Sequence, residues 1–169
     1  MVKCLKMAYA ESTYQPEVFE EAMQVYLKKS LDVRLAPPSI ETFFHDKLLV
    51  SKVIQKGLTF TFFEKIQNLL SFDESDWADY LNISQKTMQR HKKANDYTFK
   101  PLHSEKILEI VELVNRGEAV FGSSEKFNHW MRSPTMALVG NKPFDLIKDS
   151  YGRALILEEL NRIEHGIFA

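Results

Sequence analysis

The sequence predicts an all-α protein in which short helices follow one another closely. Apolar residues recur every three or four positions along most of the chain, which is the spacing of a buried helix face rather than of a strand. In the first such segment, 16–30, acidic residues come early and lysines late, as the helix dipole favours. Residues that end helices separate the segments, for example Gly57 after the segment 40–56.

The first three segments, 16–30, 40–57 and 58–72, each carry an apolar stripe at helical spacing. Pro37 and Pro38 separate the first from the second and predict a linker, because neither residue can continue a helix. The residues expected to face the core are Val18, Ala22, Val25, Tyr26, Phe43, Phe44, Leu48, Ile54, Phe62, Phe63, Ile66, Leu69 and Leu70.

Two short helices joined by a very tight turn are predicted in the middle of the chain. Ser71 and Glu74 stand at the spacing of a capping box, which marks the start of the first helix. Ser84 is placed to cap the second helix, so only Asn82 and Ile83 remain to make the turn. A turn that short needs a left-handed residue, and Asn tolerates that conformation best after Gly. We therefore expect Asn82 to be left-handed.

These two helices carry opposite charge. The first holds acids without a base, whereas the second has no acid between Ser84 and Lys93. Lysines can neutralise phosphates, and Gln and Arg side chains can pair with base edges. The candidate DNA-binding residues are Ser84, Gln85, Lys86, Gln89, Arg90 and Lys93, on the face opposite Met88. A solvated basic helix, or a helix pair that serves as a protein scaffold, would show the same charges, and the sequence leaves that alternative open.

After residue 100 we expect one long helix and then a compact terminal module. The long helix covers 100–122 and should break near Gly117. In the module, Ser123 caps a helix that Pro134 ends, a turn-rich passage follows, and the final helix covers 151–164. The residues expected to face the core are Ile107, Ile110, Val111, Val114, Phe127, Trp130, Leu155, Ile156, Leu160 and Ile163.

The residues from 58 to 169 resemble a known family. The tight turn is similar to the helix-turn-helix of Xre/Cro-like DNA-binding proteins, although Asn82 stands where these usually have Gly. The module resembles the C-terminal domain of the MbcA/ParS/Xre antitoxins, with Met131, Val139 and Phe144 departing from the usual Leu, Gly and Leu. The residues that carry this resemblance are Trp130, Pro134, Ala137, Leu138, Gly140, Pro143, Asp145, Leu146, Gly152, Leu160, Arg162, Ile163 and Gly166.

The resemblance implies an antitoxin that is not itself an enzyme. Its C-terminal domain would cover the active site of a RES-domain toxin, which consumes NAD or transfers ADP-ribose from it. The candidate toxin-binding residues are Lys148, Asp149, Tyr151, Arg153, Ile167 and Phe168. Phe168 stands out because a large apolar side chain near the chain end gains little unless something covers it, and packing on its own domain is the open alternative. A homodimer is expected, since operators for this motif are usually read by two-fold symmetric pairs.

Composition narrows the remaining classes of function. The net charge of −1 gives no global attraction to phosphate or membrane, and the single Cys4 cannot form an internal disulfide. No apolar run reaches the roughly 20 residues of a membrane-spanning helix, and no signal peptide is expected, so the chain is interpreted as cytoplasmic. The histidines are dispersed and no catalytic or phosphate-binding motif occurs, so we expect no metal and no cofactor.

The sequence therefore predicts three parts: a helical arm with a linker (1–57), a DNA-binding domain (58–122) and a toxin-binding domain (123–169). Two other functions stay open at this point. One is a stand-alone repressor without a toxin partner, and the other is a hydrolase whose site the sequence does not reveal.

Overall fold

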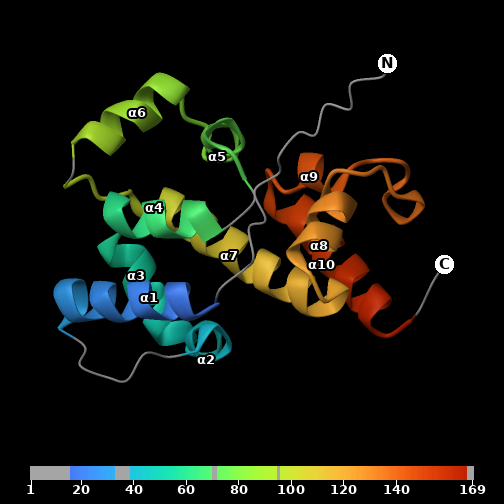
Figure 1. The fold of residues 1–169 in the computed structure, drawn as a ribbon, viewed down its shortest axis with the longest axis horizontal. Helices are drawn as coiled ribbons and strands as arrows, with labels where there is room; N and C mark the ends of the chain where they lie inside the picture. Colours follow the sequence, from blue (N-terminus) through green and yellow to red (C-terminus); the bar gives the residue numbers. More distant parts are fainter. Residues whose placement is uncertain (1–15, 33–38, 70–71, 95, 167–169) are drawn as a thin grey trace, which may run out of the picture.

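The structure is a computed structural model that describes residues 16–32, 39–69, 72–94 and 96–166. Within these ranges the chain forms ten α-helices, one 3₁₀ helix and no strand, which confirms the all-α prediction (Figure 1). The elements are α1 (Pro16–Leu31), α2 (Ile40–His45), α3 (Lys47–Lys56), α4 (Phe60–Leu69), α5 (Glu74–Tyr80), α6 (Gln85–Lys93), α7 (Pro101–Phe121), α8 (Ser124–Met131), η1 (Met136–Leu138), α9 (Pro143–Leu146) and α10 (Ser150–Glu164).

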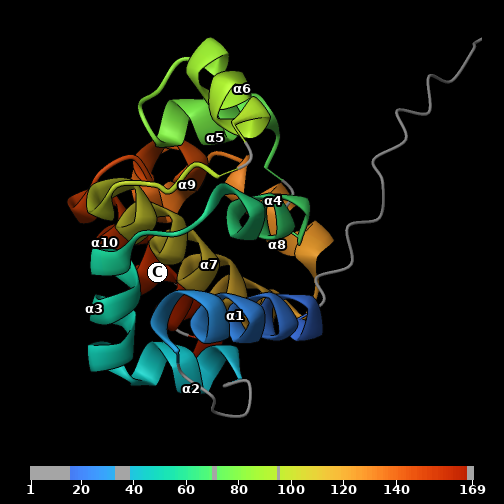
Figure 2. The ribbon, with the colours of Figure 1, turned by 90° about the vertical axis from the view of Figure 1, so that its left-hand side faces the viewer.

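The long helix α7 is shared by the two halves of the molecule. Its 21 residues extend about 30 Å, and it packs against α3 as well as against α8 and α10. Figures 1 and 2 show α1 to α4 gathered at one end of α7 and α8 to α10 at the other. Because α1 also packs against α4, the helices before residue 58 contribute to the same core as those that follow.

Aromatic side chains fill the core beneath the middle helices. Phe63 of α4 contacts Trp77 of α5 and Phe99, each with ring centroids 5.1 Å apart. The hydroxyl of Tyr26 donates a 2.6 Å hydrogen bond to the carbonyl of Gly57, and burial raises the pKa of Tyr26 to about 12. This core fixes α5 against α4, and it thereby positions the tight turn that follows α5.

In the first three segments most of the predicted core positions are buried, Val18 and Ile54 are half-buried, and two positions are exposed. Val25 is 47% exposed and Leu48 is 67% exposed. In α1 the buried stripe instead includes Phe19, Met23 and Leu27. This stripe and the one through Val25 have the same helical spacing, but its side chains are larger and bury more apolar area. The confirmed positions in the first three segments are Ala22, Tyr26, Phe43, Phe44, Phe62, Phe63 and Ile66. The linker prolines, Leu70 and the side chain of Leu69 lie outside the described residues.

The segment 40–57, expected as one helix, forms two. Asp46 leaves the helical conformation with φ −79° and ψ 79°, and its side chain accepts a 2.9 Å hydrogen bond from the backbone N–H of Leu49. Asp46 therefore ends α2 and caps α3 at the same position. Gly57 ends α3 with φ 87°, as predicted.

Gly117 is not a break but a close contact inside α7. A Cβ there would lie 2.1 Å from the ring of Phe127, so the missing side chain lets α8 approach α7. The helix ends instead at Gly122, which has φ 71°. Ser123 caps α8 as predicted, accepting from the backbone N–H of Lys126 at 3.3 Å. In α10, Leu155 is 47% exposed rather than buried, whereas the predicted core residues Ile156 and Leu160 are fully buried.

Two features are absent from the described part of the chain. None of its helices is both long and apolar enough to cross a membrane. Across the same ranges, no three His, Cys, Asp or Glu side chains are placed to hold a metal ion.

Candidate nucleic-acid and partner interfaces

The turn between α5 and α6 has the predicted left-handed residue. Asn82 has φ 54°, and its N–H donates to the carbonyl of Asp79 at 3.1 Å. The N–H of Ile83 donates to the carbonyl of Ala78 at 2.9 Å. These two bonds form a Schellman motif, which satisfies the last carbonyls of α5 and turns the chain within two residues.

The start of α5 differs from the prediction. Ser71 lies outside the described residues, and the N-cap is Asp73, which exchanges hydrogen bonds with Asp76 at 2.8 and 3.1 Å. Hydrogen bonds from Ser75 and from the backbone of Asp76 hold the pKa of Asp73 below its usual value. The pairs Ser71/Glu74 and Asp73/Asp76 have the same spacing, so the sequence alone did not distinguish these two capping boxes.

Substitution of Asn82 tests the turn directly. Asn82→Gly should leave the melting temperature unchanged or slightly higher, because Gly adopts a left-handed backbone without strain. Asn82→Val should lower the stability by about 1–2 kcal/mol, because a β-branched side chain is strained there. Thermal melts compare both variants with Gln89→Val, an exposed position inside α6. Equal tolerance of Gly and Val at position 82 would contradict a left-handed turn.

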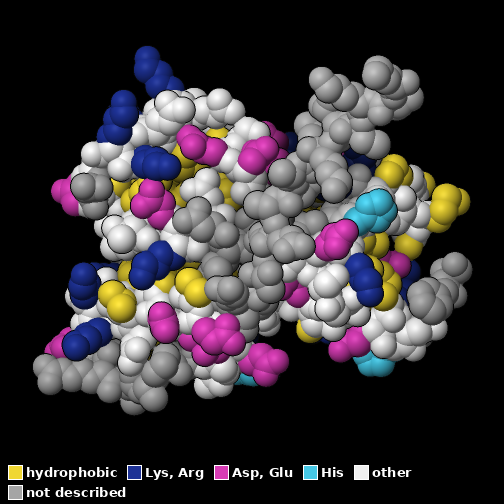
Figure 3. All heavy atoms as spheres, viewed as in Figure 1, with side chains coloured by type: hydrophobic (Ala, Val, Ile, Leu, Met, Phe, Trp, Pro, Cys, Tyr) yellow, Lys and Arg dark blue, Asp and Glu magenta, His cyan; other side chains and the backbone are white. Residues whose placement is uncertain are grey.

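All six predicted DNA-binding residues lie exposed along α6. Ser84 caps the helix by accepting from the backbone N–H of Thr87 at 3.0 Å, and Met88 is buried at 1% exposure. The exposed residues are Ser84, Gln85, Lys86, Gln89, Arg90 and Lys93. Figures 1 and 2 show α6 as the outermost helix of its half, and Figure 3 shows Lys and Arg side chains protruding from that edge.

The charges on this face are mostly unpaired. In the described part of the chain, Lys86, Arg90 and Lys93 form no salt bridge, whereas Lys92 lies 3.8 Å from Glu64. His91 stacks on Tyr97 with ring centroids 3.5 Å apart, which fixes the end of α6 to the loop that follows. Burial, followed by the nearby charge of Arg90, lowers the pKa of His91, so its ring is neutral near pH 7. The positive charge of the face therefore comes from Lys and Arg.

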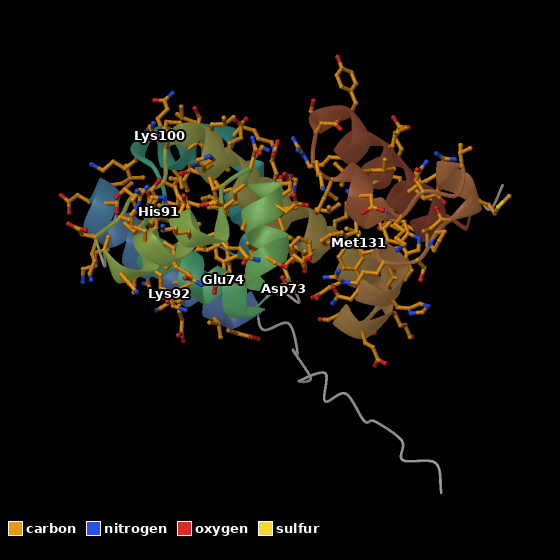
Figure 4. The ribbon with its side chains drawn as sticks, turned by 90° about the horizontal axis from the view of Figure 1, so that it is seen from above. Asp73, Glu74, His91, Lys92, Lys100 and Met131 are labelled. Atoms are coloured by element: carbon orange, nitrogen blue, oxygen red, sulfur yellow. The ribbon has the colours of Figure 1, made fainter. Side chains whose placement is uncertain are left out.

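The acids of α5 contact the C-terminal half. Asp76 pairs with Arg132 at 2.6 Å, and Asp79 pairs with Lys148 at 2.6 Å. The guanidinium of Arg132 also lies 4.4 Å from the ring centroid of Phe144. Figure 4, viewed from above, places Asp73 on the side of α5 that faces the C-terminal half and places His91 and Lys92 on the far side. The acidic charge of α5, which the sequence analysis contrasted with the basic charge of α6, therefore also forms ion pairs with the C-terminal half.

Several predicted toxin-binding residues make contacts within the chain. Asp149 caps α10, accepting from the N–H of Gly152 at 2.9 Å. Arg153, whose side chain is only 13% exposed, pairs with Glu109 of α7 at 2.5 Å. By contrast, Tyr151 is 85% exposed and stays open to a partner.

The remaining predicted partner residues, Ile167 and Phe168, lie outside the described residues. The structure also reveals two exposed apolar side chains that the sequence did not single out for binding. Met136 is 92% exposed and Val139 is 90% exposed, on the turn-rich passage between α8 and α9. In the sequence, the only sign of this exposed pair was a short apolar run with the two residues three positions apart. The same pattern is equally typical of a buried turn.

Comparisons with known proteins agree with this arrangement. Residues 50–112 match the family model of the antitoxin Xre-like helix-turn-helix domain. Residues 116–166 match that of the antitoxin Xre/MbcA/ParS C-terminal toxin-binding domain. The first match spans α5 and α6, and the second spans α8 to α10.

Three relatives that match about 70% of the chain carry the name of antitoxins. The chain is 29% identical over 126 residues to "Prs ADP-ribosylating antitoxin" of Sphingobium sp. (strain YBL2), covering 69% of this chain and 79% of that protein. It is 25% identical over 119 residues to "Antitoxin Xre" of Photorhabdus laumondii, covering 70% of this chain and 80% of that protein. It is 24% identical over 117 residues to "Antitoxin Xre" of Yersinia enterocolitica, covering 69% and 78%. With both domains matched, the chain belongs to the Xre/MbcA/ParS antitoxins, which are not enzymes.

Proposed function

We propose that this antitoxin neutralises a RES-domain toxin and binds the operator of its own operon through α6. The observation that supports the proposal is that one chain combines an exposed basic helix, the second of a helix-turn-helix domain, with a toxin-binding domain at the other end of α7. Both activities would take place in the cytoplasm, where DNA and NAD are available.

The chemistry of the toxin is inferred from one relative. The name "Prs ADP-ribosylating antitoxin" connects that protein with ADP-ribosylation. We extend this to the partner of the present chain, as a toxin that consumes NAD or transfers ADP-ribose from it. The exposed Tyr151 and the tail residues Ile167 and Phe168 remain our candidates for the contact that covers the toxin's active site.

The toxin half of the proposal has a direct test. The product of the gene adjacent to that of this chain is purified, and its NAD consumption is measured while the chain is titrated in. NAD consumption should fall to background near a stoichiometric ratio. Undiminished consumption at a large excess of chain would contradict neutralisation.

The DNA half rests on geometry and charge. Helix α6 presents Lys86, Arg90 and Lys93 to solvent next to the glutamines, without an acid on the same helix. A homodimer could place two such helices on half-sites about 34–36 Å apart, one turn of the DNA duplex.

Two substitutions separate phosphate contact from base reading. Lys93→Ala should weaken binding to all duplexes and reduce the salt slope by about one unit, because it removes one phosphate contact. Arg90→Ala should relax sequence preference, with a loss of about 1–3 kcal/mol on the operator if Arg90 pairs with a guanine. Operator and scrambled duplexes are titrated at several salt concentrations, with Lys126→Ala, an exposed lysine on α8, as the matched control. Unchanged affinity of the Arg90 and Lys93 variants for both duplexes would remove α6 from the interface.

A further inference from the structure

The loop from Thr135 to Asn141 is held by hydrogen bonds within itself. The N–H of Thr135 donates to the carbonyl of Asn141 at 3.1 Å, and the N–H of Gly140 donates to the carbonyl of Thr135 at 2.9 Å. The side-chain amide of Asn141 donates to the carbonyl of Leu138 at 2.8 Å, and Leu138 itself is buried. The loop is therefore a fixed structure, anchored in the core at its centre.

Two apolar side chains point outward from this fixed loop. Met136 is 92% exposed and Val139 is 90% exposed, so neither contributes packing to the free protein. Val139 also has a left-handed backbone, with φ 56° and ψ 40°, which β-branched residues very rarely adopt. In the free chain, both the strain and the exposure of Val139 are unfavourable.

The loop lies far from the DNA-binding face. In Figure 1 it forms the right-hand end of the molecule, whereas α6 lies at the upper left. Figure 3 shows hydrophobic side chains protruding from the same right-hand edge. The loop also lies within residues 116–166, which match the toxin-binding domain of the family.

We propose that Met136 and Val139, the 136–139 tip, insert into an apolar depression on the toxin and anchor the chain there. This rests on the proposed neutralisation of a toxin and names the surface that would carry it out. Buried apolar side chains on a preformed loop add affinity, because no entropy is lost in ordering the loop. Exposed apolar side chains that gain nothing in the free protein are typical of such interfaces.

A second copy of the chain fits the 136–139 tip less well than a toxin does. Two copies joined at this end would place their α6 helices at opposite ends of the pair. Adjacent operator half-sites instead require the two recognition helices about 34–36 Å apart. Dimerisation for DNA binding therefore needs another surface.

Val139→Gly gives a test in which stability and affinity should change in opposite directions. Gly relieves the left-handed strain and removes no packing, so the melting temperature should stay the same or rise. The dissociation constant for the purified product of the adjacent gene should increase about tenfold or more, as for the loss of an interface anchor. Met136→Ala should weaken binding similarly. Leu48→Ala, an exposed leucine on α3, is the matched control and should change neither quantity.

Each result decides between distinct explanations. If the wild-type chain binds and the Val139 and Met136 variants bind with unchanged affinity, the 136–139 tip does not contact the toxin, and the proposed function remains intact. Failure of the wild-type chain to bind would overturn both. If the melting temperature falls together with the affinity, the tip has a structural role. If the variants lose a dimer seen by size-exclusion chromatography with light scattering, the tip serves self-association. Either result would overturn the proposal.

Discussion

Replacing Gly152 with Ala should lower the melting temperature by about 5–10 °C and abolish toxin neutralisation. A Cβ at this position would lie 1.9 Å from the carbonyl oxygen of Leu146, and a backbone atom cannot move away as a side chain can. Asp149, the N-cap of α10, accepts a 2.9 Å hydrogen bond from the N–H of Gly152, so Gly152 is held in the first turn of α10, which packs against α9. Overpacking of this kind costs about 1–3 kcal/mol or more. Each kcal/mol corresponds to about 2–4 °C in a chain of this size.

Helix propensity alone predicts the opposite sign for Gly152→Ala, because Ala is favoured over Gly in a helix by about 1 kcal/mol. A thermal melt therefore distinguishes the two effects. Ser150→Ala, on the exposed first turn of α10, controls for changes in the helix start. An unchanged or higher melting temperature for Gly152→Ala would mean that α9 and α10 do not approach as closely as the structure has them.

Replacing Arg153 with Ala should destabilise the chain by about 2–3 kcal/mol. Arg153 pairs with Glu109 at 2.5 Å, and the hydroxyl of Tyr80 donates to the same carboxylate at 3.4 Å. Removal of the guanidinium would leave a partly buried carboxylate without its cation. A fully buried pair loses about 3–5 kcal/mol in this way, and the loss is smaller here because the Glu109 side chain is 28% exposed.

The loss in Arg153→Ala should also depend on pH. Burial raises the pKa of Glu109, and the charge of Arg153 opposes this rise, so removing Arg153 should raise the pKa of Glu109 further. A carboxyl group whose pKa is higher in the folded state favours folding below that pKa and disfavours it as the pH rises through it. The deficit of the variant should therefore be largest at neutral and higher pH, where Glu109 is ionised, and shrink as the pH falls through the raised pKa of Glu109.

Thermal melts from neutral to acidic pH check the prediction, and the double variant Glu109→Gln/Arg153→Ala should show a smaller deficit without the pH dependence. A deficit that is the same at every pH would contradict a role for the Glu109 charge. Because Arg153 supports the fold, loss of neutralisation in Arg153→Ala would not by itself place this residue at the toxin.

The sequence predicted the features that neighbouring residues determine. The left-handed Asn82, the cap at Ser84 and the inward Met88 each depend on contacts within a few positions, and the structure confirms all three. The all-α class was predictable for the same reason, because the helical period is a local property of the chain.

Contacts between distant residues were not predictable in this way. Arg153 was expected at a partner surface, but it pairs with Glu109, 44 positions earlier. From the sequence, the acids of α5 were interpreted only as a contrast to the basic helix expected to bind DNA. In the structure, Asp76 pairs with Arg132, 56 positions later. Charge patterns show where ionic groups lie along a helix, but they do not show which distant helix packs against them. The exposure of Val139 likewise depends on how the whole loop is anchored.

Growth of cells that express the adjacent gene product, with and without this chain, tests the central claim most directly. If the chain is the antitoxin of that protein, expression of the adjacent gene alone should arrest growth, and co-expression of the chain should restore it. Persistent arrest in cells that contain folded chain able to bind its operator would contradict neutralisation and would favour a stand-alone repressor.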